Sequence, residues 1–287
     1  MGKKLRYPTG VRPLLIAESA RRRGVEARIV SILERARFDE VILPIIDYAE
    51  PYAAVAAIDS SQTYRFIDRD GDLVAVRSDF TPMVARALAP AITSGDLPLR
   101  VFYRGDVIRY RTSRLGANRE MFQIGAEIVG DPSPRADIEV LSLVSSLLRE
   151  LGTTPIVVFT DATIPERIAG GPDPALREAL AAKRLPPKPL ELVRRLTAGT
   201  ATTRDLREFG PTKEVAERLD AIAGAAGDGC ALHLDDVDRV RGYYTGLRFR
   251  AYDTATRSTI AQGGRYDDLY EKFGAPAPAV GFTITCE

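Results

Sequence analysis

Two neighbouring stretches of the sequence decide the fold: Leu99-Arg-Val-Phe-Tyr103-Arg104-Gly-Asp106-Val107 and Met121-Phe-Gln123-Ile-Gly-Ala-Glu127-Ile-Val129. Both are rich in β-branched and aromatic residues, which predicts two long β-strands. The stretch between them contains Arg109, Arg111, Arg114 and Gly116, which indicates a basic loop. Because only this loop separates the two strands, we expect them to pair as an antiparallel hairpin.

Shorter apolar runs on both sides predict the rest of the sheet. Strands are expected at 41–43 (ended by Pro44), 65–68, 73–76, 156–159, 247–251, 258–262 and 279–285. Arg248 and Arg250 alternate with apolar residues, which predicts that 247–251 is half-buried. Helices are expected over 11–36, divided at Gly24, and after two cap signals, Thr81-Pro82 and Ser133-Pro134. Hairpin-linked strands with segregated helices predict an α+β fold, an antiparallel sheet flanked by helices.

The distribution of residue types predicts one core domain that carries an insertion. The chain has 287 residues, of which 45% are hydrophobic, enough for a sizeable core. Residues 163–228 are dominated by alanine, leucine, lysine and arginine with proline and glycine breaks, which predicts a small helical insertion. The core is then expected to comprise 1–162 and 229–287.

Charge and cysteine content exclude several classes. Lys and Arg number 40 and Asp and Glu 39, a net charge of +1, which is not typical of a general nucleic-acid binder. Cys230, Cys286 and a single histidine, His233, form no zinc or disulfide pattern, so no metal or other cofactor is expected. Scattered thiols without a secretory signal indicate the cytoplasm, and no apolar run approaches the length of a membrane span.

The hairpin also carries candidate binding residues. Arg104 and Asp106 share one side of their strand, and Gln123 and Glu127 share one side of theirs, because side chains alternate along a strand. Together they offer a guanidinium, two carboxylates and an amide on one sheet surface. An arginine can hold a phosphate, and a carboxylate can hold an ammonium or an imidazole N–H. The alternative is a solvated face with ordinary cross-strand ion pairs.

Three further segments have both a structural and a functional interpretation. Asp79 precedes the helix at Thr81, where it either interacts with the helix N-terminus or contacts a ligand. Tyr243 and Tyr244 are adjacent, so only one of them is expected to face a pocket. Gly263-Gly264 at a strand end suits either a bulge or the close approach of a ligand.

Taken in order, these segments resemble the histidyl-tRNA synthetases of class II. The matching segments are Arg77-Ser-Asp79-Phe-Thr81-Pro82, Tyr103-Arg104-Gly-Asp106, Phe122-Gln123-Ile-Gly-Ala-Glu127, Tyr243-Tyr244-Thr-Gly246, Gly263-Gly-Arg-Tyr266-Asp267 and Ala279-Val-Gly-Phe282. Pro44 resembles the proline of motif 1, which in that family lies at the dimer interface. The resemblance implies a class II synthetase-like catalytic domain and a histidine pocket.

Departures from the synthetase pattern indicate a particular branch of the family. Asp106 stands where synthetases carry the glutamate of motif 2, no motif 3 arginine follows Glu287, and no anticodon-binding domain is expected. Such a chain is similar to the regulatory subunits of ATP phosphoribosyltransferase. The resemblance implies a non-catalytic protein that pairs with a short catalytic subunit in the first step of histidine biosynthesis, and that takes part in feedback inhibition by histidine.

The resemblance also implies site residues. The histidine-binding residues would be Asp79, Thr81, Gln123, Glu127, Arg239, Arg241, Tyr243, Tyr244 and Tyr266, with Arg104 and Asp106 as a residual nucleotide site. Arg239 aligns without a gap to the catalytic arginine of the family. Arg241 matches the Arg-Gly pair of the family's histidine motif only if two residues are deleted from the alignment. We expect a homodimer through Pro44 within a hetero-oligomer, with histidine as effector and without tRNA. The alternatives are an active synthetase or a fragment of one, and a stand-alone histidine-binding paralogue.

Overall fold

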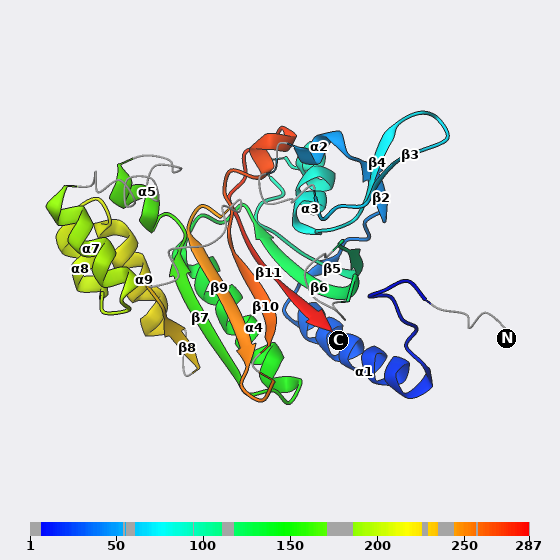
Figure 1. Cartoon of the computed structure of the whole chain (residues 1–287), viewed down its shortest axis with the longest axis horizontal. Helices are drawn as coiled ribbons and strands as arrows, with labels where there is room; N and C mark the ends of the chain where they lie inside the picture. The colour runs from blue at the N-terminus through cyan, green and yellow to red at the C-terminus, as the bar shows by residue number, and fades with distance from the viewer. Residues whose placement is uncertain are drawn as a thin grey trace.

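A computed structural model describes residues 7–53, 55, 61–93, 95–110, 118–170, 186–225, 229–234, 244–256 and 258–286. Its main feature is an eight-stranded sheet in the order β1-β5-β6-β11-β10-β9-β7-β8 (Figure 1). The strands are β1 Asp39–Glu40, β5 Leu99–Ile108, β6 Glu120–Val129, β7 Pro155–Asp161, β8 Cys230–Leu232, β9 Leu247–Asp253, β10 Thr259–Arg265 and β11 Ala279–Cys286. The outermost pairs, β1 with β5 and β7 with β8, are parallel, and the others are antiparallel.

The predicted hairpin is confirmed as the longest strand pair of the sheet. β5 and β6 pair from Leu99 opposite Val129 to Ile108 opposite Glu120. β11 joins the other edge of β6, with Gly281 opposite Glu127. The hairpin and the last strand therefore lie side by side, although the segments are far apart in the sequence.

Helices cover both faces of this sheet. α1 (Ile16–Arg35) and α4 (Pro134–Glu150) pack on one face through the largest hydrophobic cluster, which includes Leu33 and Val144. α3 (Thr81–Leu88) covers the other face through Phe80 and Val84, which pack against Tyr103. The short elements α2 (Glu50–Ala53), η1 (Ala89–Ala91) and η2 (Tyr270–Phe273) lie near α3. The predicted α+β class, with helices flanking a mainly antiparallel sheet, is confirmed.

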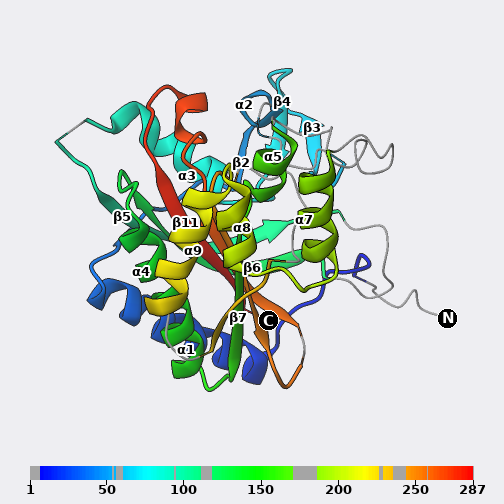
Figure 2. The same ribbon diagram turned by 90° about the vertical axis from the view of Figure 1, so that its left-hand side faces the viewer.

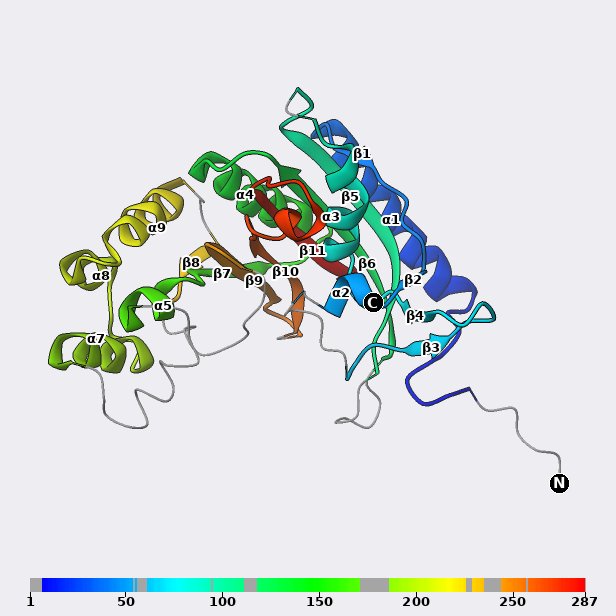
Figure 3. The ribbon, with the colours of Figure 1, turned by 90° about the horizontal axis from the view of Figure 1, so that it is seen from above.

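Two smaller groups lie at opposite ends of the molecule (Figure 3). One is a three-stranded sheet in the order β2-β4-β3, made of Ile46–Tyr48, Leu73–Val76 and Arg65–Ile67. The other is the helical group that Figure 2 brings to the front: α5 (Ile164–Ala169), α7 (Pro187–Thr197), α8 (Thr203–Phe209) and α9 (Lys213–Ala225). Helices thus occupy the described part of 163–228, while the division of the chain into domains stays a prediction.

Four local expectations are wrong. α1 begins only at Ile16, because Leu15 is extended, and it runs unbroken through Gly24. Residues 41–43 form no strand in the structure, although Val41 still donates its N–H to the Phe102 carbonyl at 2.8 Å. Arg248 is buried, whereas the alternation predicted an exposed side chain, and Arg250 is intermediate. Thr81 is the first residue of α3 rather than its N-cap; the Asp79 carboxylate accepts its N–H at 3.0 Å.

Candidate functional site

The floor of the candidate pocket is a row of residues across neighbouring strands. Strand pairing sets Glu127 of β6 beside Gly281 of β11, and Gly281 beside Gly264 of β10. A Cβ atom at Gly281 would lie 1.4 Å from Oε2 of Glu127, and one at Gly264 would lie 2.7 Å from the Tyr244 ring. The two glycines therefore leave the space that the carboxylate and the tyrosine ring occupy.

Glu127 is a buried carboxylate held by three hydroxyl groups. Its Oε1 accepts hydrogen bonds from Thr81 Oγ1 at 3.0 Å and from the Tyr103 hydroxyl at 3.2 Å. Its Oε2 accepts a close hydrogen bond from the Tyr266 hydroxyl. Burial raises the pKa of Glu127 to about 8, although the three hydroxyl donors act in the opposite direction.

The rim of the pocket combines a carboxylate and a guanidinium. Asp79 lies at the start of α3, and Arg109 NH2 is 3.6 Å from its Oδ2. Arg109 is anchored by a 2.7 Å hydrogen bond from its Nε to the Ser78 carbonyl. Burial raises the pKa of Asp79, and the Arg109 charge opposes this shift.

Residues of α3, β6, β10 and β11, and of segments that flank α3, β5, β9 and β10, line the pocket. The lining residues are Asp79, Thr81, Arg109, Gln123, Tyr244, Gln262, Gly263, Gly264, Tyr266, Gly281, Phe282 and Thr283. Glu127 lies directly behind this lining, because two of its donors, Thr81 and Tyr266, belong to it. A second cavity of about 300 Å³ lies between β4, α2 and α3 and shares Asp79 with the pocket. The candidate pocket itself has a volume of about 20 Å³, and its lining combines the Asp79 carboxylate with the Arg109 guanidinium, which are partners for the cationic and anionic groups of a ligand.

Five of the predicted histidine-binding residues come together in the lining: Asp79, Thr81, Gln123, Tyr244 and Tyr266. Glu127 joins them through its hydrogen bonds. Arg239, Arg241 and Tyr243 lie outside the residues that the structure describes. Pro44 is exposed, and its carbonyl accepts a hydrogen bond from Arg77 NH1 at 3.3 Å.

The expectation that Arg104 and Asp106 share a surface with Gln123 and Glu127 is wrong. Arg104 pairs with Glu40 of β1 at 2.7 Å and with Glu26 of α1 at 2.8 Å. Asp106 faces Arg22 of α1 at 3.8 Å. The reason is the register, which places Tyr103 opposite Gly125 and Gly105 opposite Gln123, so that Arg104 and Asp106 point to the other face.

Three polar residues of the lining, Arg109, Gln262 and Thr283, were not among the predicted histidine-binding residues. Arg109 was expected only as part of the basic loop. Alternation places Arg109 on the same face as Tyr103, but only the observed register shows that this is the pocket face. Thr283 pairs with Gly125 and with Gln262, which brings both polar side chains onto the same face. No local signal in β10 or β11 indicates this pairing.

Two classes of site find no support in the described part of the chain. It holds no group of three or more His, Cys, Asp or Glu side chains arranged to bind a metal ion. Its helices include none that is long and apolar enough to cross a membrane.

Comparison with known proteins defines the class. The family model for histidyl-tRNA synthetase matches residues 10–287. The fold is similar to a solved ATP phosphoribosyltransferase regulatory subunit/histidyl-tRNA synthetase from Bacillus halodurans, with a TM-score of 0.86 and 22% identity, covering 100% of this chain and 82% of the other. It is also similar to a histidine–tRNA ligase subunit from Alicyclobacillus acidocaldarius, with a TM-score of 0.79 and 26% identity over 100% and 96% of the two chains. The fold is that of a class II, histidyl-tRNA synthetase-like protein, as the sequence predicted.

Curated relatives narrow the class further. ATP phosphoribosyltransferase regulatory subunits from Desulforamulus reducens and Pseudomonas aeruginosa are 31% and 30% identical to this chain. The matches cover 98% and 96% of this chain and 77% and 78% of the relatives. The chain belongs to the family of ATP phosphoribosyltransferase regulatory subunits.

Proposed function

We propose that this chain is the regulatory subunit of an ATP phosphoribosyltransferase and senses histidine in the pocket above Glu127. The names of its relatives support the assignment to this enzyme, and the chemistry of the pocket supports histidine as the effector. The enzyme would be the one that begins histidine biosynthesis, with a separate short chain as its catalytic subunit. Histidine can regulate the complex only by binding one of its conformations better than another.

The observation that carries the histidine assignment is the buried carboxylate of Glu127 behind a polar lining. Histidine presents an ammonium group, a carboxylate and an imidazole N–H. Asp79 and Glu127 offer acceptors for its donors, while the Arg109 guanidinium is a partner for its carboxylate. Tyr244 and Tyr266 supply aromatic walls. Arg239, Arg241 and Tyr243 stay part of the proposed site as sequence predictions.

Replacement of Glu127 by alanine tests this assignment. The variant removes the acceptor for two lining hydroxyls and leaves a ligand donor unpaired, which costs on the order of 1–3 kcal/mol of binding free energy. Calorimetry with histidine is expected to show a dissociation constant weakened roughly tenfold or more. Glu208→Ala, at an exposed residue of α8, is the matched control and is expected to bind like the wild type. Equal affinity of Glu127→Ala and wild type would refute the site.

The second candidate function is aminoacylation, because a histidine–tRNA ligase subunit shares the fold at 26% identity. We propose instead that the chain has no catalysis of its own, since the curated relatives are regulatory subunits. Histidine-dependent exchange of pyrophosphate into ATP is expected to be at background level. Robust exchange that disappears in Glu127→Ala would establish the synthetase function in place of the regulatory one.

The proposed assembly is a homodimer within a hetero-oligomer. Around Pro44 the side chains of Ile42, Ile45 and Ile46 are 86%, 56% and 48% exposed. Leu15 and Ile16, at the start of α1, are exposed as well. An apolar surface of this kind is typical of a subunit interface.

A further inference from the structure

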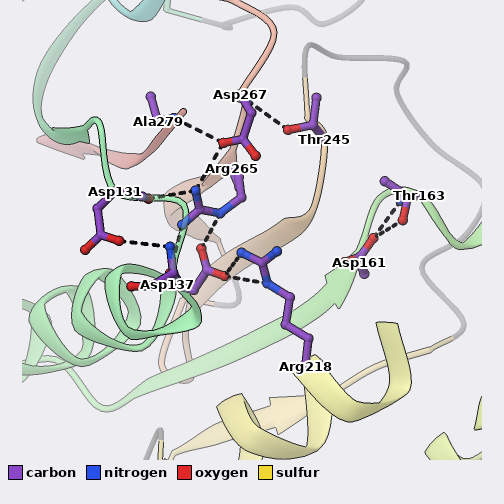
Figure 4. Close-up of polar contacts among 10 residues, drawn as sticks. Asp131, Asp137, Asp161, Thr163, Arg218, Thr245, Arg265, Asp267 and Ala279 are labelled. Carbon is purple, nitrogen blue, oxygen red and sulfur yellow. Dashed lines mark hydrogen bonds and ion pairs between the residues drawn. The ribbon is translucent and has the colours of Figure 1, made fainter. Parts of the chain in front are cut away.

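Figure 4 shows a chain of ion pairs that links Arg218, Asp137 and Arg265. The side chains of Asp137 in α4 and Arg265 in β10 are both fully buried. Arg265 Nε donates to Asp137 Oδ1 at 2.8 Å, and Arg218 Nε of α9 donates to Asp137 Oδ2 at 2.8 Å. A single carboxylate thus joins a guanidinium of the sheet to a guanidinium of the helical group.

On the pocket side, Arg265 holds the segment that carries Tyr266. Its NH1 donates to the Asp131 carbonyl at 3.0 Å and to Asp267 Oδ1 at 3.1 Å, and its NH2 donates to the Ser133 carbonyl at 3.2 Å. The next residue, Tyr266, donates its hydroxyl to Glu127. The position of Arg265 therefore sets the position of a side chain that lines the pocket.

The same segment fixes the neighbourhood of Tyr244. The N–H of Asp267 donates to Thr245 Oγ1 at 2.8 Å, and the N–H of Thr245 donates to the Arg265 carbonyl at 2.8 Å. Gly246 leaves space for the Arg265 stem, since a Cβ there would lie 3.3 Å from its Cδ. Both tyrosines of the pocket are therefore next to residues that Arg265 or its segment holds in place.

The helical group is connected to this segment at two points, indirectly through Asp137 of α4 and directly through the backbone of Gly246. Arg218 extends from α9 with its side chain 24% exposed. At the other end of the group, the N–H of Ala162, just before α5, donates to the Gly246 carbonyl at 2.8 Å. Arg218 and Ala162 are far apart in the sequence, yet both are connected to residues 245–267.

Stability alone does not account for the Asp137 cluster. Burying a carboxylate and a guanidinium has a desolvation cost that can exceed their mutual attraction, and apolar residues of similar volume stabilise a fold as well or better. What buried pairs provide is one defined arrangement of the elements that they join. Here those elements are α9, α4 and β10.

We propose that Arg218, Asp137 and Arg265 couple helix α9 to the ligand pocket. A ligand that engages Tyr266 and Glu127 orders the Arg265 segment, which holds Asp137 and through it Arg218. Coupling of binding free energies is reciprocal, so a displacement of α9 by a partner protein changes ligand affinity by the same factor. The proposal rests on the proposed function only in taking histidine as the ligand. Arg218 is a positioning residue, because it does not line the pocket.

Arg218→Gln tests the coupling in the full chain. The variant removes one charge at a partly exposed site and leaves the pair of Asp137 with Arg265 in place. Calorimetry is expected to show histidine binding weakened about fivefold or more, the lower end of typical coupling. Hydrogen exchange is expected to slow in α9 of the wild type when histidine is added. In Arg218→Gln, the slowing is expected to remain in α3 and to vanish in α9.

Two control variants separate coupling from general loosening. Arg204→Gln removes a charge on α8 that pairs only with Glu208 among the contacts described, and it is expected to behave like the wild type. Ile222→Val loosens the buried face of α9 without touching the ion pairs, and it is expected to keep wild-type affinity. The coupling is refuted if Arg218→Gln binds histidine with an affinity within twofold of the wild type and histidine still slows hydrogen exchange in its α9. It is also refuted if Ile222→Val loses as much histidine affinity as Arg218→Gln.

A ligand-free measurement distinguishes failure of this proposal from failure of the proposed function. Tyr266→Phe removes the hydroxyl contact to Glu127, and faster exchange in α9 is expected without any ligand. If the wild type binds no histidine but this effect is present, the effector assignment is wrong and the coupling stands. If exchange in α9 is unchanged by Tyr266→Phe, the coupling is wrong.

Discussion

Glu127 is a buried acid, and no ion pair joins it to a cation among the residues that the structure describes. Its described partners are the hydroxyls of Thr81, Tyr103 and Tyr266, which donate hydrogen bonds but carry no charge. Burial therefore dominates, and the pKa rises from 4.5 to about 8. In the ligand-free protein the folded state thus binds a proton that the unfolded chain has already lost at neutral pH.

The raised pKa predicts how stability changes with pH. Protonation of Glu127 in the folded state stabilises the protein fully below pH 4.5, the pKa of the unfolded chain. This stabilisation is lost as the pH rises through about 8, where Glu127 ionises in the folded state as well. This one group should lower the free energy of unfolding by about 1.4 kcal/mol per pH unit across that window. Glu127→Gln cannot ionise, so its stability, measured by urea unfolding at pH 5, 7 and 9, should lack this loss. Parallel pH profiles for the two proteins would contradict the shifted pKa.

At the scale of elements, the pairing of β11 with β6 creates the pocket. The register places Gly281 opposite Glu127 and Thr283 opposite Gly125. Gly125 makes the same kind of space for the Tyr103 hydroxyl, which lies 2.3 Å from the position of a Cβ. Glycines on two strands thus allow a glutamate and a tyrosine of their neighbours to lie flat against the sheet.

Gly281→Ala tests this packing. The new methyl group would overlap Glu127 Oε2 and lie 2.5 Å from the Ala126 carbonyl oxygen, so the carboxylate must move. Overpacking of this kind typically costs roughly 1–3 kcal/mol of stability, and histidine binding is expected to be lost with it. Gly24→Ala, in the middle of α1 with open space around it, is the control and should stabilise by about 0.5–1 kcal/mol. Thermal melting measures the stability of the two variants, and calorimetry measures their histidine binding. Wild-type histidine binding by Gly281→Ala would contradict the placement of the histidine site above Glu127.

At the scale of the whole molecule, apolar residues remain exposed at the end opposite the helical group. Besides the residues around Pro44, they include Tyr48 in β2, Phe66 and Ile67 in β3, and Leu73 in β4. The described part of the helical group contributes none of the large exposed apolar side chains. The two ends of the molecule therefore present different surfaces, and only one of them resembles a subunit interface.

Ile42→Lys is expected to dissociate the proposed homodimer, because the substitution would bury a charge without a partner in the interface. Sedimentation at micromolar concentration should show a dimer for the wild type and a monomer for the variant. Ile156→Lys, at an exposed position of β7, is the matched control and should remain dimeric. A monomeric wild type, or dissociation of both variants alike, would show that residues around Pro44 do not form the interface.

Much of the fold could be predicted from the sequence because its signals are local. β-Branched and aromatic residues on both sides of one basic loop indicated the β5–β6 hairpin, and proline residues indicated where α3 and α4 begin. The same signals failed at 41–43, where an apolar run forms no strand, and at Arg248, which is buried although alternation predicted an exposed side chain. Asp79, Gln123 and Tyr266 were predicted from resemblance to a family and meet in one pocket.

The sequence by itself determined which elements form, because spacing and capping act within a few residues. Only the tertiary structure decided which side chains meet. It turned Arg104 toward α1 and brought Arg109 to the pocket, because register selects one of two faces. It also placed Gly281 against Glu127, and Arg218 against Asp137 across 81 residues of sequence. Contacts between residues so far apart in the sequence depend on how the whole chain packs, and no local sequence pattern predicts that packing.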